Sequence, residues 1–266
     1  MSERSFSSDD GVRLVYDDSG PRDGVPLVLC HGLTMEGAQF RDSAAWFAAR
    51  GYRVLTPDLR GHGRSGVPAQ VSRASFSLAR FGADAAAMLA DAGLERVHWV
   101  GNSLGGFVGL SLLPAHRLLS LTTYGTAYRI GLHGAITQAW VGLGFLLLPR
   151  RGIARMMALL VSRHRPTADY VAAHILATRP DVIAAIAGTV GRYDLSPGVR
   201  AATAPILLLD CRKDWLVGWA MGSTRRLAHE LAGVEGVTLA AGGHCADLDD
   251  AAAWRAAVLR FVEGTR

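Results

Sequence analysis

The sequence predicts an α/β fold with a mostly parallel central sheet of about eight strands and helices on both of its faces. Short apolar or β-branched runs alternate along the chain with segments of helical periodicity, a pattern typical of parallel sheets covered by helices. The chain has 266 residues, of which 50% are hydrophobic, so it can bury one large core. We therefore expect one α/β domain with room for an inserted subdomain.

The apolar runs and the turn residues between them place the individual elements. Residues 5–8 and 12–16 are expected to form a first hairpin, because Asp9, Asp10 and Gly11 separate the two runs. The other expected strands cover residues 27–30, 53–56, 97–101, 118–124, 206–209 and 237–239. The expected helices cover residues 40–50, 81–91, 104–113, 223–231 and 249–262; Gly51 and Gly93, both favoured helix-stop residues, follow the first two.

The interval 126–200 breaks this alternation and has a purely helical pattern. We expect it to be a helical cap inserted over the carboxyl edge of the sheet, with residues 1–125 and 201–266 forming the core domain. Residues 130–148 contain no charged side chain, a composition that a membrane-spanning helix requires. Four glycines, His133, Thr137 and Gln138 in this stretch favour a cap helix packed on the core instead. We therefore expect no stable membrane insertion.

Charge and cysteine content narrow the possible partners. The formal net charge is +5, and the interval 126–200 carries the excess, with nine basic residues against three acidic ones. Basic residues are not interleaved with aromatic ones along a face, so no nucleic-acid binding is expected. Cys30, Cys211 and Cys245 have neither the spacing of a disulfide framework nor that of metal ligands, and we expect buried thiols and no metal site. The first residues lack the layout of a secretory signal, which favours a cytoplasmic location.

The strongest chemical motif is Gly-Asn-Ser-Leu-Gly-Gly at residues 101–106. It follows an expected strand directly and precedes an apolar helix, the context in which Gly-x-Ser-x-Gly forms a sharp turn that presents the serine hydroxyl. Ser103 is therefore the candidate nucleophile. Leu104 lies in the first turn of the helix, where its backbone N–H can face a developing oxyanion. The alternative is a glycine-rich turn in which Ser103 only caps the helix.

A serine hydroxyl is a weak nucleophile until a base removes its proton, so a histidine must lie within reach. His244 is the best placed of the nine histidines, because it follows the last expected strand and precedes the last expected helix. His164 and His174, in the inserted interval, are alternatives as pocket residues. The other histidines considered are expected to be structural or on the surface, namely His62, His98, His116 and His229.

The base needs a carboxylate that fixes its tautomer and orientation. Asp214 follows the strand expected at 206–209 and lies at the same edge of the sheet as Ser103 and His244. Asp210 is the rival, but it lies so close to the end of this strand that we expect it to bond the following loop. We therefore expect Asp214 to be the acid.

With these motifs in place, the chain resembles the α/β-hydrolase superfamily over essentially its whole length. The order Ser103, Asp214, His244 is the order of that fold. His31-Gly32 and the segment 58–65, Asp-Leu-Arg-Gly-His-Gly-Arg-Ser, are similar to family signatures at the same relative positions. The resemblance implies an α/β-hydrolase fold with a helical cap, a second oxyanion N–H from Leu33, and a serine hydrolase that needs no metal or organic cofactor.

The chain also departs from common family forms. Trp215 follows the acid where many relatives have a proline, and Cys245 follows the base where carbon–carbon hydrolases often have tryptophan. The motif around Ser103 nevertheless resembles that of the same carbon–carbon hydrolases. An aspartate nucleophile is absent, so dehalogenase and epoxide hydrolase activities are not expected.

One further motif is a decoy. Residues 61–66 fit the dinucleotide-binding pattern G-x-G-x-x-G, which has meaning only where a strand runs directly into a helix. Here Pro57 and Asp58 follow the strand, and Pro68 stands where the helix should begin. We predict a turn.

Apolar side chains of the cap suggest the kind of substrate. Trp140, Phe145, Met156 and, beside the acid, Trp215 are candidates for the pocket lining, although helical spacing of such residues is also typical of core packing. We expect a small-molecule substrate, namely a small or medium, mostly apolar carboxylic ester or lactone, hydrolysed through an acyl-enzyme. The alternatives are a carbon–carbon bond hydrolase of β-diketone-like substrates and a slow or non-catalytic binding protein of the same fold.

Overall fold

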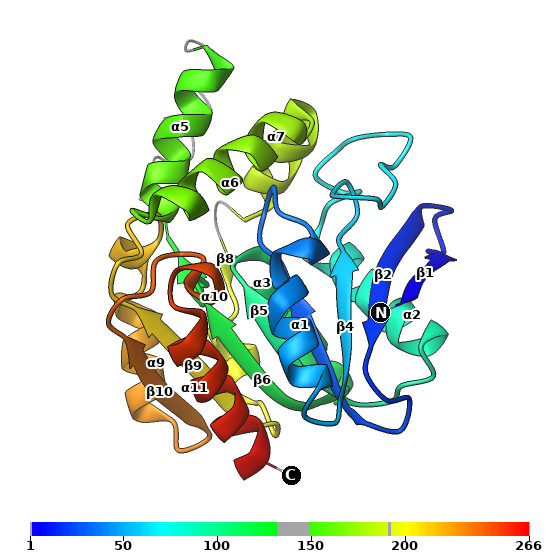
Figure 1. The fold of residues 1–266 in the computed structure, drawn as a ribbon, viewed down its shortest axis with the longest axis vertical. Helices are drawn as coiled ribbons and strands as arrows, with labels where there is room; N and C mark the ends of the chain where they lie inside the picture. Colours follow the sequence, from blue (N-terminus) through cyan, green and yellow to red (C-terminus); the bar gives the residue numbers. More distant parts are fainter. Residues whose placement is uncertain (1, 132–148, 191–192, 266) are drawn as a thin grey trace.

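The structure, a computed structural model, describes residues 2–131, 149–190 and 193–265 (Figure 1). These residues form an eight-stranded sheet in the order β1-β2-β4-β3-β5-β6-β9-β10. The first two pairings are antiparallel and all the others are parallel. The strands are β1 Ser2–Ser7, β2 Arg13–Ser19, β3 Val25–Cys30, β4 Tyr52–Asp58, β5 Val97–Asn102, β6 Leu118–Tyr124, β9 Ile206–Cys211 and β10 Val234–Leu239. The predicted sheet is confirmed, although most strands are longer than their apolar runs.

Helices cover both faces of the sheet, as predicted. The helices α1 (Arg41–Ala48) and α11 (Ala251–Gly264) pack on one face through a cluster around Phe47 and Trp254. On the other face lie α2 (Leu78–Asp91), α3 (Leu104–Leu112), α8 (Ser196–Arg200) and α9 (Gly222–Glu230). Short 3-10 turns cover Gly37–Phe40, Leu113–Ala115 and Gly218–Ala220.

Side-chain caps explain where two helices differ from the predicted bounds. The helix expected from residue 81 begins at Leu78, because the Ser77 hydroxyl accepts a hydrogen bond from the Arg80 N–H. The helix expected from residue 249 begins at Ala251 as α11, and a separate short helix, α10 (Ala246–Asp249), precedes it. Asp250 separates them with a non-helical backbone and caps α11 through the Ala253 N–H.

The inserted interval lies at one end of the molecule, over the carboxyl ends of the parallel strands (Figure 1). Its described helices are α5 (Arg150–Val161), α6 (Arg165–Ala177) and α7 (Pro180–Thr189). The expectation of a purely helical interval is wrong, because β7 (Arg129–Ile130) pairs antiparallel with β8 (Tyr193–Asp194). Each strand has only two residues, too few for an alternating pattern, and the pairing joins distant parts of the chain. Residues 132–148, most of the charge-free stretch, lie outside the described residues.

In the part of the chain that the structure describes, no individual helix has both the length and the apolar character needed to span a membrane. Taken together, α6 and α7 meet these two criteria, but they are bent by 103° at the break between them.

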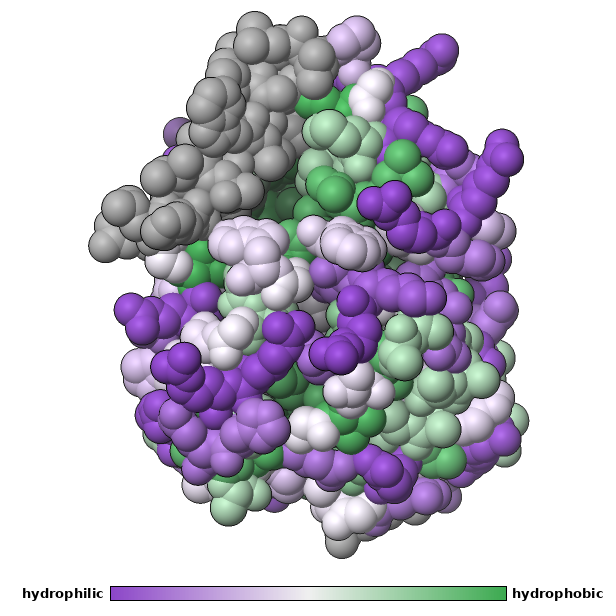
Figure 2. All heavy atoms as spheres, turned by 90° about the vertical axis from the view of Figure 1, so that its left-hand side faces the viewer, coloured by the Kyte–Doolittle hydropathy of each residue, from purple (hydrophilic) through white to green (hydrophobic). Residues whose placement is uncertain are grey.

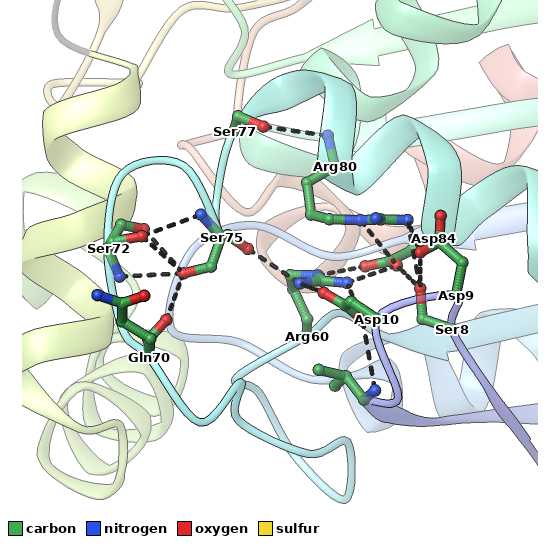
Figure 3. Close-up of polar contacts among 11 residues, drawn as sticks. Ser8, Asp9, Asp10, Arg60, Gln70, Ser72, Ser75, Ser77, Arg80 and Asp84 are labelled. Carbon is green, nitrogen blue, oxygen red and sulfur yellow. Dashed lines mark hydrogen bonds and ion pairs between the residues drawn. The ribbon is translucent and has the colours of Figure 1, made fainter.

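A buried arginine ties the first hairpin to the loop after β4 (Figure 3). The side chain of Arg60 is fully buried, and its guanidinium donates to Asp84 of α2 at 2.5 and 2.7 Å and to Asp10 of the hairpin turn at 2.8 Å. The Ser8 hydroxyl donates to the same Asp84 carboxylate at 2.6 Å. A buried charge is tolerated only with such partners. The cluster therefore fixes the loop after β4, whose residue Leu59 donates its N–H to His31.

Candidate active site

Ser103 lies at the junction of β5 and α3 in a strained backbone conformation. Its φ is +49° and its ψ is −111°, a combination that costs a non-glycine residue on the order of 1–3 kcal/mol. The flanking glycines are required because the chain approaches itself closely. A Cβ at Gly101 would lie 2.3 Å from the carbonyl of Gly105, and a Cβ at Gly105 would lie 2.2 Å from the Cys30 oxygen. The predicted strand–turn–helix context of the motif is confirmed.

His244 and Asp214 form a buried pair at the carboxyl ends of β10 and β9. The His244 Nδ1 and the Asp214 Oδ2 are 2.8 Å apart, and the two side chains are 6% and 3% exposed. The other carboxylate oxygen, Oδ1, accepts the N–H groups of Leu216 and Val217, each at 3.0 Å. With the Nδ1 proton directed at the carboxylate, Nε2 has the free lone pair that a general base needs.

The same contacts decide the charge of Asp214. Burial by itself raises the pKa of this carboxyl, but the nearby imidazole and the two backbone N–H donors outweigh it, so its pKa is below the ordinary value. Asp210, the rival carboxylate, pairs instead with Arg225 of α9, with oxygen–nitrogen distances of 2.9–3.0 Å. The structure therefore brings Asp214, not Asp210, to His244.

Residues 124–126, at the end of β6 and just after it, contact both the Ser103 main chain and the His244 ring. The Ser103 N–H donates to the Tyr124 carbonyl at 2.8 Å. The next residue, Gly125, has a φ of +61°, and a Cβ placed on it would lie 2.8 Å from both Nδ1 and Cε1 of His244. The Thr126 hydroxyl donates to the Ser103 carbonyl at 3.0 Å. Three consecutive residues thus hold Ser103 and support the His244 ring.

The two candidate oxyanion donors, the N–H groups of Leu104 and Leu33, are oriented by different parts of the structure. The N–H of Leu104 lies at the start of α3, where the first N–H groups of a helix have no partner within the helix. The N–H of Leu33 shares a peptide unit with the Gly32 carbonyl, which accepts from the His31 Nδ1 at 2.7 Å and from the Met35 N–H at 3.2 Å. Because a trans peptide directs its N–H and its C=O oppositely, these bonds fix the direction of the Leu33 N–H.

His31 is itself held in one tautomer. It is fully buried, and its Nε2 accepts the Leu59 N–H at 3.0 Å, so the proton is on Nδ1. Burial lowers the pKa of His31, which keeps the ring neutral. His62, whose ring centroid is 5.2 Å away, is also buried, and burial lowers its pKa to about 3. The segment 58–65 thus supports the loop that carries Leu33.

Residues 61–66 form the predicted turn. The Gly61 N–H donates to the Gly66 carbonyl at 2.9 Å, and no helix begins in this described segment. Asp58, just before the turn, accepts the Gly37 N–H at 2.7 Å and the Arg64 N–H and Nε at 2.9 and 2.7 Å. These bonds tie the turn to the loop after β3.

The cap helices contact the loops of the site directly. At the end of α5, the Val161 carbonyl accepts the His244 N–H at 2.8 Å, and the Ser162 hydroxyl donates to Asp249 at 2.6 Å. His174 of α6 places its Nε2 3.5 Å from Glu36 in the loop after β3. His164 instead contacts Thr167 of its own helix at 3.0 Å. The cap is therefore attached both to the loop of the candidate base and to the loop of the candidate oxyanion donor.

Two of the four candidate pocket residues can be placed. Met156 on α5 is 47% exposed, and Trp215 is 58% exposed, with the Arg163 guanidinium 5.8 Å from its ring centroid. Trp140 and Phe145 lie outside the described residues. Figure 2 shows hydrophobic side chains in a hollow between the described part of the cap and the core domain. A separate small cavity of about 20 Å³ between the first hairpin, α2 and β5 includes none of the candidate site residues in its lining.

The three cysteines are buried, and the described residues show no cluster of possible metal ligands. Cys30, Cys211 and Cys245 are buried free thiols, and burial raises the pKa of each. Within residues 2–131, 149–190 and 193–265, no cluster of three or more His, Cys, Asp or Glu side chains is arranged to hold a metal ion.

The contact between Asn102 and His244 was not predicted from the sequence. The Asn102 Nδ2 donates to the His244 carbonyl at 2.7 Å, across 142 positions of the chain. The only sequence signal was the place of Asn102 immediately before Ser103 in the motif.

Comparison with known proteins identifies the family of the chain. A family model described as the alpha/beta hydrolase fold matches residues 25–251. A Variovorax paradoxus protein, whose assigned name RutD is that of a carbamate hydrolase, is 29% identical over 94% of this chain and 96% of its own. A hydrolase structure from Pseudomonas aeruginosa is 25% identical, with a TM-score of 0.83 over 98% of both chains. The Rhodococcus esterase RhEst1 is 24% identical, with a TM-score of 0.84 over 100% of both chains. The chain is a hydrolase of the α/β-hydrolase family.

Proposed function

We propose that the protein is a serine esterase in which Ser103 is the nucleophile, His244 the general base and Asp214 the residue that orients the base. The observation that carries this proposal is the 2.8 Å contact between the His244 Nδ1 and Asp214. The imidazole also packs on Gly125, the residue after Tyr124, whose carbonyl accepts the Ser103 N–H. The strained φ of Ser103 supports it further, because such strain is typical of a serine held for attack.

The reaction proceeds in two steps. The His244 Nε2 takes the Ser103 proton as the hydroxyl oxygen attacks the substrate carbonyl, and the resulting oxyanion accepts the N–H groups of Leu33 and Leu104. Collapse expels the alcohol, protonated by His244, and leaves an acyl group on Ser103. Water, deprotonated by the same imidazole, then hydrolyses the acyl-enzyme and restores the serine.

The substrate class we propose is a small or medium, mostly apolar carboxylic ester or lactone. The apolar hollow beside the cap and the exposed ring of Trp215 support an apolar acyl group. The names of the relatives support a bond to a carbonyl carbon, since one denotes a carbamate hydrolase and another an esterase. A carbamate has a nitrogen and an ester has a carbon on the acyl side of the carbonyl, and both are cleaved by attack on the carbonyl carbon.

A panel of p-nitrophenyl esters from acetyl to dodecanoyl, with a p-nitrophenyl carbamate beside it, tests this proposal. We expect turnover that peaks at one acyl length and is lost in Ser103→Ala. The peak gives the size of the acyl pocket. If the wild type hydrolyses no ester faster than Ser103→Ala does, the esterase proposal is contradicted. A β-diketone-like substrate cleaved by the wild type alone would then favour the carbon–carbon hydrolase.

A further inference from the structure

A buried polar network lies directly beneath the nucleophile and the base. Asn102 is the last residue of β5, is fully buried, and precedes the proposed nucleophile. Its Nδ2 donates to the main-chain carbonyl of His244 at 2.7 Å. One side chain therefore links the turn that carries the nucleophile to the loop that carries the base.

The N–H, the carbonyl and the ring Nδ1 of His244 each form a hydrogen bond with a different part of the fold. The N–H donates to Val161 of the cap, the carbonyl accepts from Asn102, and the ring Nδ1 contacts Asp214. The ring also packs on the Cα of Gly125. With the main chain fixed on both sides and Nδ1 bonded, the direction of Nε2 is determined.

Asn102 is supported from below by a buried amide and a buried carboxylate. The Gln39 Nε2 lies 3.5 Å from the Asn102 Oδ1 and 3.0 Å from each carboxylate oxygen of Asp247. Asp247 lies three residues after His244 and also accepts the Tyr124 hydroxyl at 2.9 Å. All four side chains are buried.

The network closes on the nucleophile. The backbone carbonyl of Tyr124 accepts the Ser103 N–H at 2.8 Å, while its hydroxyl bonds Asp247. A continuous path therefore runs from Ser103 through Tyr124, Asp247 and Gln39 to Asn102, the residue next to Ser103. A buried hydrogen-bonded network resists movement of its members, because a member that moves loses bonds to its neighbours.

We propose that Asn102, held by Gln39 and Asp247, is a positioning residue that sets the place of His244 relative to Ser103. The residue acts through the His244 main chain and does not touch the reacting atoms. The inference rests on the proposed function, because the alignment of His244 with Ser103 matters only if these residues are the base and the nucleophile. Misplacement of a base by about 1 Å is enough to slow such a reaction by roughly a hundredfold.

The test is the variant Asn102→Ala, assayed with the best ester of the panel. The concentration of competent active sites is measured by titration with a fluorophosphonate. Titration counts competent sites, so a smaller folded fraction does not register as a slower enzyme. We expect kcat per titrated site to fall at least twentyfold with KM within threefold of wild type, and labelling of Ser103 to slow by a similar factor. Gln39→Leu, which leaves Asn102 in place, should lower kcat by a smaller factor of about three to ten.

Thr122→Val is the matched control. Thr122 is a buried polar residue of β6, the strand that carries Tyr124, and its hydroxyl has no hydrogen-bond partner within the described part of the chain. The kcat per titrated site of Thr122→Val should match that of the wild type. If Asn102→Ala does not fold, Gln39→Leu decides the matter alone. A kcat per site within twofold of wild type in every variant that folds would overturn the inference, whereas wild-type protein that is not labelled at Ser103 would overturn the proposed function itself.

Discussion

The imidazole of His244 rests on the Cα of Gly125 so closely that a single methyl group would not fit between them. A Cβ at residue 125 would lie 2.8 Å from two ring atoms, and the φ of +61° already disfavours any side chain there. The segment after β6 therefore restricts where the base can lie.

The change Gly125→Ala should lower kcat by about 10²-fold, because the ring must move away from Ser103. Gly93→Ala is the control, since Gly93 has a similar φ of +68° and no atom within 4 Å of its imagined Cβ. Both variants should lose roughly 1 kcal/mol or more of stability from backbone strain, measured by urea unfolding. Equal kcat losses in the two variants would contradict a specific contact with His244.

The change Asp214→Asn should lower kcat by roughly 10³–10⁴-fold, the size of effect seen when a base loses its tautomer-fixing carboxylate. Asp210→Asn removes a nearby carboxylate, on β9, that bonds Arg225 instead, and should leave kcat within about threefold of wild type. Steady-state kinetics of the two variants under identical conditions make the comparison. A larger loss of kcat in Asp210→Asn than in Asp214→Asn would show that Asp210, not Asp214, is the acid.

The change His31→Gln should slow acylation about tenfold or more, because the Gly32–Leu33 peptide loses the bond that fixes its direction. His98→Gln is a control at another buried imidazole, which contacts Ser120 away from this loop. Stopped-flow measurement of the p-nitrophenol burst reports acylation separately from deacylation. The expectation fails if the burst rate of His31→Gln equals that of His98→Gln.

Asp247 should make the protein less stable as the pH rises. Burial raises its pKa to about 7, against an ordinary value of 3.8. The folded state therefore binds a proton that the unfolded state has released between pH 4 and 7, so the free energy of unfolding falls over that window. Between pH 5 and pH 8 the loss is on the order of 2 kcal/mol.

Asp247→Asn removes this titration, so its unfolding free energy should change less between the two pH values. The carbonyl Oε1 of Gln39 is buried and makes no hydrogen bond within the described residues, so a flipped amide can accept from the new Asn side chain. Urea unfolding of wild type and variant at pH 5 and pH 8 measures the difference. Parallel pH dependence in both proteins would show that Asp247 is not the titrating group.

The sequence predicted the strands and the turn around Ser103 because each depends on a local pattern, whereas Leu33 was expected only from the family resemblance, and the roles of the triad and of Leu33 stay predictions. Apolar runs mark strand centres, but β2 continues through Asp17 and Asp18, which are buried because Arg64 and Arg53 pair with them. Such long-range pairs have no signature in a local window. The two-residue pairing of β7 with β8 escaped prediction for the same reason.

The geometry around His244 depends on contacts between distant residues. The motif identified Ser103, but the contact of Asn102 with the His244 carbonyl and the support of Asp247 by Tyr124 and Gln39 require the folded chain. The cap boundaries at 126–200, the pocket residues and the cytoplasmic location stay predictions from the sequence.

Trapping of the acyl-enzyme tests the central claim most directly. Wild-type protein mixed with a p-nitrophenyl ester, quenched in acid within the burst and examined by intact and peptide mass spectrometry, should gain the mass of one acyl group on Ser103. Ser103→Ala should gain none, and Asp214→Asn should acylate slowly at the same serine. An acyl group on another residue, or turnover without any acyl adduct, would contradict the account.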